Sequence, residues 1–486
     1  MNINWPQFLF QTAPWMIPLA SALIILLVGP FLRNHHRFSL SVTLLSSFAA
    51  LSYAWQNWFL AKGETAGLFL FDKFTYLFVI FFLLALILTV LLSFDYLKSL
   101  GLVRPEYYAL LNFAVFGMGC MAAGHDLMVV FLGLEIMSVS IYVLAGFQRS
   151  NNRCVEAALK YFLIGAFASS FLLMGIAFIY GASGTTDLIV LHQKGLELLS
   201  GPSRIFTLIG LSLLGVGLAF KIAVVPFHYW VADVYEGSPL IVTNFMATAV
   251  KAAGFAALLR VVWALFQWEP QFLSHVVWIA AAVTMTIGNV AALMQKNLKR
   301  MLAYSSIAHA GYALVPLVAY ASHGPEVVSA VGFYLLTYIL MTVGAFAILI
   351  ALTSQSNGEE KCGLHDLAGL GIEKPFLGFA MTVLMLSLAG IPPTMGFFGK
   401  YFLFLQAIKG GTIWLVVVAV LNSVISVYYY LSPVVAMYFG KETKTETSTA
   451  FALPLSILAV IWISILSVLF FGLFPTHLID FIKLSA

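Results

Sequence analysis

Charged residues are scarce in this chain. Only 9% of its 486 residues are Asp, Glu, Lys or Arg, whereas an average soluble domain carries roughly 25%. A chain with so little charge cannot cover a folded surface that faces water, so a soluble globular protein is excluded. Cysteine is scarce too, and Cys120, Cys154 and Cys362 form no CxxC pair. Neither a disulfide framework nor a cysteine metal site is therefore predicted.

The sequence also lacks the signatures of redox and hydrolytic sites. It contains no glycine-rich nucleotide loop between a strand and a helix, no cysteine cluster suited to iron–sulfur, and no Ser–His–Asp set on its short loops. We therefore expect no cofactor and no metal on this chain, and we expect it to act only together with partner subunits.

Long apolar stretches fill most of the sequence. Hydrophobic residues make up 62% of the chain, and the mean hydropathy is +0.98. A helix needs about 20 apolar residues to cross roughly 30 Å of hydrocarbon, whereas a membrane β-barrel would show alternating segments of about ten. The predicted fold class is an all-α polytopic membrane protein, with about fourteen helices near residues 12–32, 38–60, 73–97, 105–125, 126–148, 154–181, 204–232, 239–266, 272–294, 300–321, 325–353, 376–408, 412–438 and 451–474.

Basic residues divide unevenly between the loops on the two sides of the membrane. With an outer N-terminus, six Lys and Arg residues lie in outer loops and thirteen lie in inner loops, among them Lys361, Lys441 and Lys444. The positive-inside rule then places both termini outside. Because the net charge of +4 follows from this topology, binding to nucleic acid is not indicated.

Four charged side chains lie inside segments that are otherwise apolar enough to cross a bilayer. They are Glu135, Lys221, Lys251 and Lys400. An ionised group at the hydrocarbon centre costs about 2.5–3.5 kcal/mol even on lenient insertion scales, so four of them require a protein-lined, hydrated interior. The pattern indicates a proton or ion path. A purely structural contact between helices is the alternative interpretation of Glu135 and Lys221.

Prolines interrupt two of the predicted helices beside two of these lysines. Pro226 follows Lys221 in KIAVVPFHYW, and Pro392 and Pro393 precede Lys400 in LAGIPPTMGFFGK. Proline removes a backbone donor, so a helix broken in this way survives in lipid only where water or neighbouring groups satisfy its backbone. The seventh and twelfth helices are therefore predicted to be broken.

The two broken helices are five apart, which is an odd spacing, so they would cross the membrane in opposite directions. Paired interruptions of this kind are typical of inverted-repeat transporters. Helices four to eight and nine to thirteen then form two inverted five-helix repeats. The predicted divisions are 1–104 for the first three helices, 105–266 and 267–440 for the repeats, and 441–486 for the last helix and tail.

Three further polar residues in or beside apolar segments are candidates for the path. His309 would link two of the buried lysines through bound water or serve only in packing. His228, just after the first proline break, would take part in proton movement or cap the broken helix. Lys160 follows Glu156 by four residues, a spacing that fits an entry path or a surface pair equally well.

Two other features are interpreted as contacts with the membrane interface. Arg260 is expected to extend its charge outward along the helix. The run Tyr428–Tyr430 fits an interfacial aromatic belt.

Four segments together resemble a known family. They are FLGLEIMSVSIYVLAGFQR, LAFKIAVVPFHYWVADVYEGSP, NLKRMLAYSSIAHAGY and MLSLAGIPPTMGFFGKYFLF. In order and spacing they are similar to the antiporter-like membrane subunits of NADH:quinone oxidoreductase, respiratory complex I, over essentially the whole chain. Within that family the chain is most similar to the N-type subunits, because it ends soon after the fourteenth helix and carries lysine at position 400, where M-type subunits carry glutamate.

This resemblance implies a proton-translocating subunit of a bacterial inner membrane. By motif, Glu135 and Lys221 match the family's glutamate–lysine pair, Lys251 its central lysine and Lys400 its terminal lysine. Quinone reduction in other subunits would drive the relay, and pairing and unpairing of Glu135 with Lys221 would switch whether the lysine holds its proton. FMN, iron–sulfur clusters and quinone are expected on partner subunits, and the partners are other membrane-arm subunits and the lipid bilayer.

Two other functions stay open on the sequence alone. A subunit of a multisubunit cation/proton antiporter would share the same ancestry, but it would co-purify with small antiporter subunits instead of quinone-reductase subunits. An autonomous solute transporter would need a cavity lined by clustered polar groups, whereas this sequence offers titratable groups with few polar neighbours.

Overall fold

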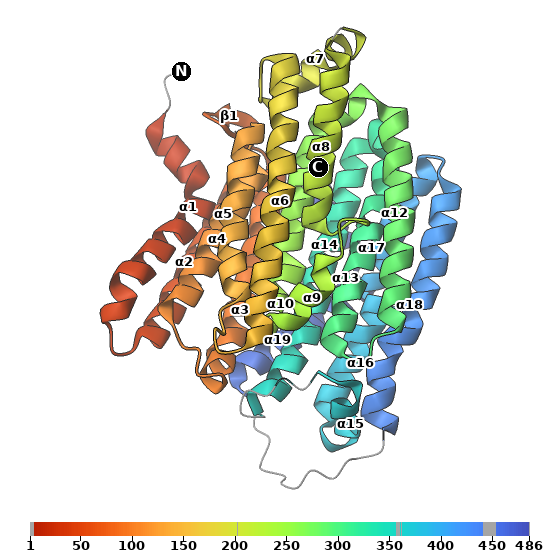
Figure 1. Ribbon diagram of the computed structural model, residues 1–486. Coiled ribbons are helices and arrows are strands. Elements are labelled where there is room, and N and C mark those ends of the chain that lie inside the picture. The colour runs from red at the N-terminus through yellow and green to blue at the C-terminus, as the bar shows by residue number, and fades with distance from the viewer. Residues whose placement is uncertain (1–3, 202, 356–359, 361, 441–452, 486) are drawn as a thin grey trace.

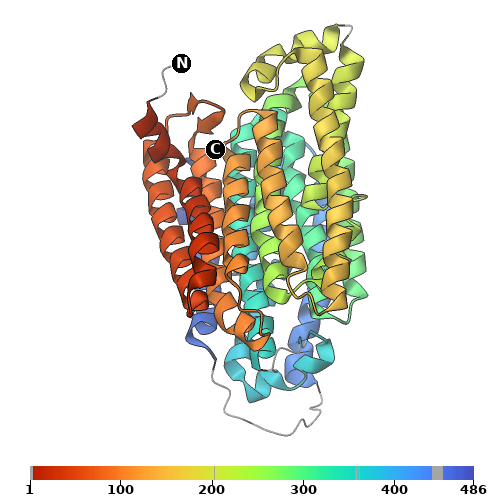
Figure 2. The same ribbon diagram turned by 60° about the vertical axis from the view of Figure 1, so that its left-hand side comes forward.

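The computed structural model describes residues 4–201, 203–355, 360, 362–440 and 453–485. Its helices run roughly along one common axis and form one bundle (Figure 1). The first two helices form a flank of this bundle, as a view from a second side shows (Figure 2).

Apart from one short hairpin, the elements of the described residues are helices. The first part of the chain forms α1 (Trp5–Val28), η1 (Gly29–Phe31), α2 (His35–Leu60), β1 (Glu64–Ala66), β2 (Phe69–Phe71), α3 (Lys73–Ser99), α4 (Pro105–Ala123), α5 (Leu127–Ala145), α6 (Asn152–Ser183), α7 (Leu188–Ser200), α8 (Arg204–Ile222), α9 (Trp230–Gly237), α10 (Leu240–Phe245), the π-helical turn η2 (Met246–Val250), α11 (Lys251–Leu265) and η3 (Phe266–Trp268). The second part forms α12 (Pro270–Leu293), α13 (Leu298–Leu314), η4 (Val315–Ala319), α14 (Tyr320–Gln355), η5 (Leu364–Leu367), α15 (Leu370–Glu373), α16 (Pro375–Ala389), α17 (Met395–Lys409), α18 (Ile413–Phe439), α19 (Leu455–Leu473) and α20 (Pro475–Lys483).

The two ends of the chain lie on the same side of the bundle as the hairpin. Strands β1 and β2 pair antiparallel, and the Gln7 amide nitrogen lies 3.2 Å from the Glu64 carboxylate on β1. At the other end of the chain, the Ser485 hydroxyl accepts a hydrogen bond of 2.6 Å from Trp58 at the end of α2. The structure thus agrees with two termini on one side, which the distribution of basic residues predicts to be the outer side.

Loops predicted to be on the inner side gather at the opposite end. A Cβ atom on Gly237, at the end of α9, would lie 2.7 Å from the Arg153 carbonyl oxygen at the start of α6. Gly371 in α15 lies in the same way against the Met437 backbone at the end of α18. Three of the predicted inner lysines lie outside the described residues: Lys361, Lys441 and Lys444.

Eleven helical stretches among the described residues are long and apolar enough to cross a membrane. One of them, Leu298–Thr353, makes two crossings, because the backbone leaves helical geometry at His323, with φ −139° and ψ 39°. Helix α4, with 19 residues, and the shorter half-helices α16 and α17 complete the bundle. The structure therefore confirms an all-α polytopic membrane fold and fits about fourteen crossings.

Both predicted helix breaks are present. Helix α8 ends at Ile222, where Ala223 takes a left-handed conformation with φ 65°, and α9 begins only at Trp230. Helix α16 ends at Ala389, where Gly390 has φ 86°, and α17 begins at Met395. The α8–α9 pair runs toward the inner loops, whereas the α16–α17 pair runs away from them (Figure 1). The broken helices therefore run in opposite directions, as their odd spacing predicts.

Small residues let neighbouring helices approach closely. A Cβ atom on Gly117 of α4 would lie 2.5 Å from the Gly133 carbonyl oxygen of α5. A Cβ atom on Gly175 of α6 would lie 2.9 Å from the Gly210 carbonyl oxygen of α8. Because lipid gives no hydrophobic drive for helices to associate, such close backbone contacts supply much of the packing in membrane bundles. This packing fixes α5, α6 and α8, the helices that carry the first charged groups, against one another.

Apolar stretches do not predict the short elements η5 and α15, nor the following three. Helix α7 lies on the outer side, where its His192 ring stacks on Trp263 at a centroid distance of 4.9 Å. Helix α20 has only nine residues and is amphipathic, with Ile482 buried while Asp480 and Lys483 are exposed. The β1–β2 hairpin has three-residue strands. All three are too short or too polar to register as membrane spans.

Candidate functional site

Three of the four charged groups predicted within the membrane are buried in the middle of the bundle. Lys221, Lys251 and Lys400 are each 4% exposed, whereas Glu135 on α5 is partly exposed. Ionised groups in such surroundings are stable only when polar atoms of the protein or water surround them. The partners of each group therefore decide what the group can do.

Glu135 and Lys221 lie in one cluster, but different hydroxyls hold them. The Ser169 hydroxyl of α6 donates a short hydrogen bond to the Glu135 carboxylate. The Lys221 ammonium donates to the Ser138 hydroxyl at 2.7 Å, and Ser138 is one helical turn beyond Glu135 on α5. The same ammonium lies 5.6 Å from the centre of the Tyr161 ring. The carboxylate and the lysine are thus close neighbours that can change partners with small movements.

A small cavity adjoins these two groups. It is lined by Ser169, Lys221, Tyr142 and neighbouring apolar residues, and its volume is about 10 Å³. A buried water needs roughly 10–15 Å³ and two to four polar partners. The cavity touches the lysine and the serine that binds Glu135, and its volume is at the lower limit for a single water.

The first helix break places Lys221 at the end of a half-helix. Lys221 lies in the last turn of α8, where the unpaired carbonyl groups favour a positive charge. Beyond the break, the Val225 amide donates to the Thr284 hydroxyl of α12 at 3.1 Å, so a neighbouring helix satisfies the interrupted backbone. Pro226 is exposed in this segment, and His228 is partly buried. The His228 carbonyl accepts from the Val231 amide in the first turn of α9, whereas its Nδ1 atom is buried without a hydrogen-bond partner among the described residues.

Lys251 begins α11 directly after the π-helical turn η2. Its ammonium donates to both oxygens of Ser306 on α13, to the hydroxyl at 2.8 Å and to the carbonyl by a shorter bond. The Tyr338 ring of α14 lies 5.6 Å from the same ammonium. π-helical turns are rare and occur often at functional sites. The π-helical turn lies immediately before the residue predicted to be the central lysine.

His309 on α13 is 2% exposed and hydrogen-bonded through both ring nitrogens. Its Nδ1 atom lies 2.6 Å from the Tyr334 hydroxyl of α14, and its Nε2 atom lies 2.8 Å from the Tyr430 hydroxyl of α18. A neutral imidazole has one donor and one acceptor nitrogen. His309 can therefore accept a proton on one side while it releases one on the other.

Lys400 on α17 is held by the second helix break. Its ammonium donates to the Ala389 carbonyl oxygen at 2.7 Å, which belongs to the carbonyl end of half-helix α16. It also donates to the Ser423 hydroxyl of α18 at 2.9 Å. A Cβ atom on Gly390 would lie 2.9 Å from Cδ of Lys400, so the lysine passes directly beside this glycine. Lys400, like Lys221, thus meets the negative end of a half-helix next to a proline break.

Tyrosine rings span the gaps between these groups. Tyr338 lies between Lys251 and His309, 5.6 Å from the ammonium and with its ring centre 4.8 Å from the His309 ring centre. Tyr312 lies between His309 and Lys400, at ring-centre distances of 6.0 Å and 4.9 Å. The structure thus brings the second half of the predicted path together in the order Lys251, His309, Lys400.

The sequence does not indicate which serines and tyrosines contact the buried lysines and His309. The run Tyr428–Tyr430 was predicted to be an interfacial belt, and this is wrong for two of its three members. Tyr428 is 74% exposed, but Tyr429 and Tyr430 are 2% and 0% exposed and belong to the polar interior. Helical geometry is the reason, because three successive residues span about 200° around the helix and cannot all share one face.

The prediction for Arg260 is also wrong. Arg260 is 6% exposed and does not extend outward. Its guanidinium makes two bonds of 2.6 Å to the Asp72 carboxylate, and a third of 2.8 Å to the Thr75 hydroxyl. Asp72 also accepts from the Thr75 amide and so caps α3. A bidentate carboxylate in reach is a better partner than the interface, so this pair ties α11 to α3.

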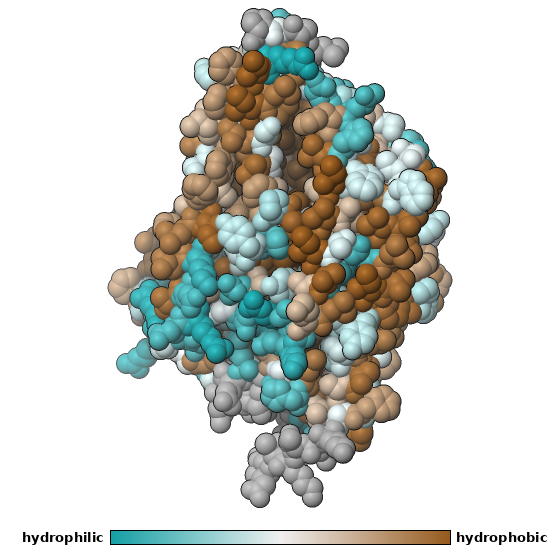
Figure 3. Space-filling view, turned by 45° about the vertical axis from the view of Figure 1, so that its right-hand side comes forward, coloured by the Kyte–Doolittle hydropathy of each residue, from teal (hydrophilic) through white to brown (hydrophobic). Residues whose placement is uncertain are grey.

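Lys160 belongs to a cluster of charges at the inner end of the bundle. Its ammonium lies 2.7 Å from Glu156 and 3.2 Å from Asp233 of α9. Arg300 of α13 binds Asp233 at 3.2 Å and Glu236 at 2.5 Å. A hydrophilic patch covers the lower part of one face of the molecule, below a largely hydrophobic middle (Figure 3). Lys160 therefore lies away from the line of buried lysines, on the inner side of the first helix break.

Residues that could bind a metal do not come together. Among the described residues, no three His, Cys, Asp or Glu side chains are placed so that they could hold one ion. Cys120, Cys154 and Cys362 are free and buried. What the site offers instead is a line of groups that can gain and lose protons.

Comparison with known proteins places the chain among membrane subunits of known complexes. A family model described as NADH:quinone oxidoreductase/Mrp antiporter, TM, matches residues 124–426. The chain is 45% identical over 451 residues to NADH-quinone oxidoreductase subunit N of Trichlorobacter lovleyi, covering 91% of each chain. It is 39% identical over 488 residues to NADH-quinone oxidoreductase subunit N 1 of Solibacter usitatus, covering 99% of this chain and 98% of the relative.

Solved structures agree with these relatives. A chain of respiratory complex I from Thermus thermophilus with bound aureothin is 36% identical, with a TM-score of 0.80, and the match covers 97% of this chain and 100% of that one. A chain of the Mrp complex from a Dietzia species shares the fold, with 22% identity, a TM-score of 0.84 and coverage of 98% and 96%. The length and identity of these matches show that the chain belongs to the NADH-quinone oxidoreductase subunit N family of multi-pass membrane proteins.

Proposed function

We propose that this chain carries protons across the membrane as a subunit of a proton-translocating NADH:quinone oxidoreductase, through Glu135, Lys221, Lys251 and Lys400. The observation that carries the proposal is the line of buried lysines, linked from Lys251 to Lys400 by His309 and tyrosine rings. Four charged groups in a membrane interior are costly, so their presence calls for a function.

The chemistry of the lysine partners supports proton movement. Lys221, Lys251 and Lys400 each donate to serine hydroxyls or to backbone carbonyls. A lysine ammonium held by neutral oxygens can release its proton to a water or to a neighbouring base, whereas an arginine cannot. A proton that reaches Lys251 can thus pass through the His309 ring and the adjoining hydroxyls to Lys400.

Glu135 and Lys221 supply the switch at the other end of the line. The carboxylate is partly exposed on α5, and the cavity of about 10 Å³ lies between its serine partner and the lysine. If Glu135 turns toward Lys221, it holds the proton on the lysine, and if it turns away, the proton can leave. His228 and Lys160 lie on the inner side of this pair, where they support a route from the inner surface.

The energy for this movement would come from other subunits. FMN, iron–sulfur clusters and quinone would lie on those partners, and this chain would contact the neighbouring membrane-arm subunits. Residues 105–266 and 267–440 form the two inverted units in this proposal, because each contains one broken helix and the two broken helices run in opposite directions. The divisions at 1–104 and 441–486 enclose the remaining helices.

Replacement of Lys251 tests the proposal. Lys251→Met removes the titratable group, and Lys251→Arg keeps the charge but cannot release a proton. Both variants should lower quinone-coupled proton pumping in membrane vesicles by about tenfold or more, as expected when a positioned proton carrier is lost. Lys409→Met is the control, because Lys409 is exposed at the end of α17 and is expected to pump normally.

Normal pumping by assembled Lys251→Met complex would refute the relay. Purification of the native complex from membranes supplies a second test. Recovery of redox subunits with NADH:quinone reductase activity is expected, whereas recovery of small antiporter subunits without such activity would favour the cation/proton antiporter.

A further inference from the structure

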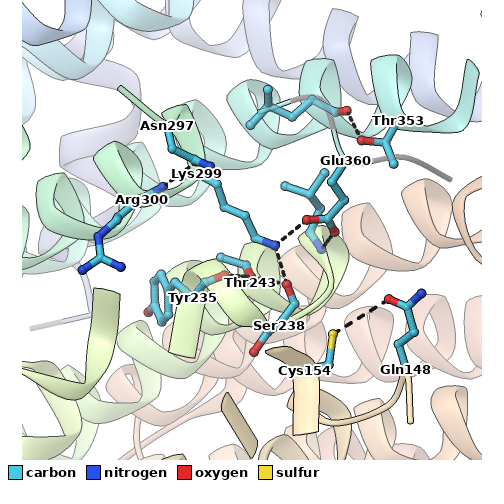
Figure 4. Close-up of polar contacts among 12 residues, drawn as sticks. Gln148, Cys154, Tyr235, Ser238, Thr243, Asn297, Lys299, Arg300, Thr353 and Glu360 are labelled. Atoms are coloured by element: carbon cyan, nitrogen blue, oxygen red, sulfur yellow. Dashed lines mark hydrogen bonds and ion pairs between the residues drawn. The ribbon is translucent and has the colours of Figure 1, made fainter. Parts of the chain in front are cut away.

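A second buried lysine–carboxylate pair lies at the inner end of the bundle, apart from the proposed relay. The Lys299 ammonium of α13 lies 2.7 Å from the Glu360 carboxylate, and the two side chains are 2% and 30% exposed. Glu360 reaches this position from the segment that joins α14 to η5. Figure 4 shows both side chains converging on the turn between α9 and α10.

Each partner of this pair also binds one backbone group of that turn. Lys299 donates to the Ser238 carbonyl oxygen at 2.5 Å. The Leu240 amide donates to the Glu360 carboxylate and to the Tyr96 hydroxyl of α3, each at 3.0 Å, and that hydroxyl donates to the same carboxylate oxygen at 2.9 Å. The pair is therefore more than an ion pair, because Lys299 binds the Ser238 carbonyl and Glu360 binds the Leu240 amide of the same short segment.

The turn between α9 and α10 needs such partners. Ser238 is extended, with φ −74° and ψ 155°, and Pro239 has no amide hydrogen to give. The Ser238 carbonyl and the Leu240 amide therefore cannot complete a continuous helical ladder, and unsatisfied backbone groups at the edge of a membrane bundle are costly. Lys299 binds the Ser238 carbonyl beside a longer contact of 3.5 Å from the Thr243 hydroxyl, and Glu360 binds the Leu240 amide together with Tyr96. The two charged groups thus help to fix the direction in which α10 leaves the turn.

The elements that meet at this turn carry both halves of the proposed relay. Helix α9 is the inner half of the first broken helix, and α10 continues through the π-helical turn into Lys251. Helix α13 begins beside Lys299 and carries Ser306, the hydrogen-bond partner of Lys251, and His309. A shift of α10 against α13 would separate Lys251 from Ser306.

We infer that Lys299 and Glu360 are positioning residues that lock the α9–α10 turn and so keep Lys251 against Ser306. Neither side chain touches the proposed relay groups, and both act through the backbone of Ser238 and Leu240. The effect on pumping rests on the proposed function, whereas the effect on the turn does not.

Two variants remove the pair from different sides. Glu360→Ala leaves the Leu240 amide with the Tyr96 hydroxyl as its partner and leaves Lys299 without its carboxylate, whereas Glu360→Gln keeps an acceptor and a similar shape. Lys299→Met removes the donor to Ser238. Loss of one member of a buried pair is strongly destabilising, so the partly exposed Glu360→Gln variant serves as the measurement if the other two fail to assemble.

Exchange of the two charges separates positioning from simple ion pairing. The double variant Lys299→Glu with Glu360→Lys restores opposite charges, but it places a carboxylate against the Ser238 carbonyl and an ammonium against the Leu240 amide. If the pair acts only as an ion pair, this exchange should rescue the single variants. If it acts through hydrogen bonds to the backbone of the turn, the exchange should not rescue them.

The chain contains a native reporter for this region. Cys362 lies two residues from Glu360 and is 4% exposed, and its carbonyl accepts from the Leu298 amide at the start of α13. Burial raises the pKa of the Cys362 thiol to about 12, and the thiolate is the form that reacts with maleimides. Release of the segment should therefore speed the labelling of Cys362, which peptide mapping distinguishes from labelling of Cys120 and Cys154.

The experiment uses the assembled complex in native membranes. Labelling of Cys362 by N-ethylmaleimide and hydrogen exchange of the peptide that contains Leu240 are measured beside quinone-coupled pumping. We expect Glu360→Ala and Lys299→Met to raise both rates by about tenfold or more, as for the loss of a charged hydrogen bond, and to lower the number of protons pumped per quinone. Glu360→Gln should change each quantity in the same direction by less. Lys483→Met with Asp480→Asn, an exposed pair on α20, is the matched control and should change nothing.

Three outcomes would overturn the inference. They are unchanged labelling and exchange in the assembled single variants, full rescue by the charge exchange, and an opened turn with normal pumping. Lys251→Met measured in the same membranes keeps the two proposals apart. Normal pumping by Lys251→Met would reject the relay, whatever the labelling of Cys362 shows.

Discussion

The three buried lysines of the proposed relay have neutral hydrogen-bond partners. The ammonium groups of Lys221, Lys251 and Lys400 donate to hydroxyls and carbonyls. Arg260 shows the contrast, since two short bonds to one carboxylate hold its charge in place. Lysine with neutral partners is suited to transfer, whereas arginine with a bidentate carboxylate is suited to structure.

Removal of the imidazole tests the site at the scale of one residue. His309→Phe preserves an aromatic ring of similar size but removes both nitrogens that bind Tyr334 and Tyr430. We expect pumping to fall by about tenfold or more, because no other group bridges the two tyrosines. Proton uptake by vesicles, normalised to assembled complex, measures the effect. His275→Phe, at an exposed histidine of α12, is the control, and equal pumping by the two variants would exclude the ring from the path.

The charged groups of the site could be predicted from the sequence, but their partners could not. Lys251 and Lys400 stand out because a charge in an apolar segment has a large cost, and this cost makes the signal specific. Ser306 and Tyr430 give no such signal, since hydroxyl groups occur in membrane helices for many reasons. Which hydroxyl meets which lysine depends on helix rotation and on crossing, and apolar periodicity defines neither of these.

At the scale of elements, the two half-helices α8 and α16 each place the negative, carbonyl end of a helix near a buried lysine. Helix α8 carries Lys221 in its own last turn, and the last residue of α16, Ala389, accepts a hydrogen bond from Lys400. Pro226 and Pro392 indicate these breaks in the sequence, so the broken helices could be predicted. The π-helical turn before Lys251 could not, because its residues are ordinary helix formers and only tertiary packing inserts the extra residue.

A glycine pair tests the second break. Gly390→Ala places a methyl group 2.9 Å from Cδ of Lys400 in a backbone with φ 86°. Gly411→Ala is the matched control, because φ is 77° there and no atom lies within 4 Å of the added methyl group. Both variants should lose about 1–2 kcal/mol of stability from the left-handed backbone. Only Gly390→Ala should lower pumping, and thermal unfolding together with proton uptake separates the two effects. Equal pumping by the two variants would show that Lys400 does not depend on this contact.

At the scale of the whole molecule, the proposed relay is one line that crosses both proposed halves of the chain. It begins near α5 and α6, passes α11 and α13, and ends between α17 and α18. Such a line can carry protons only when every group along it binds and then releases a proton in turn. A block at one end should therefore affect the other end, although many helices separate the two.

Loss of the terminal lysine tests this dependence. Lys400→Ala should lower quinone reduction and proton pumping together, because a blocked exit stalls a tightly coupled machine. Lys400→Glu should retain part of both activities, since a carboxylic acid can also carry a proton. Side-by-side assays of quinone reductase activity and proton uptake, normalised to assembled complex, provide the measurement. Full turnover with lost pumping in Lys400→Ala would show instead that the electron and proton reactions can run separately.

The two hydrogen bonds of His309 have a consequence for how protons would move through the proposed relay. A ring that accepts a proton at one nitrogen and releases another from the opposite nitrogen ends as the other neutral tautomer. In that form it faces both tyrosines with donor and acceptor reversed, and it cannot repeat the transfer until it turns or exchanges back. In the proposed relay, the ring would therefore pass one proton for each reset. This would protect a proton gradient, because an unbroken water column would let the gradient leak back.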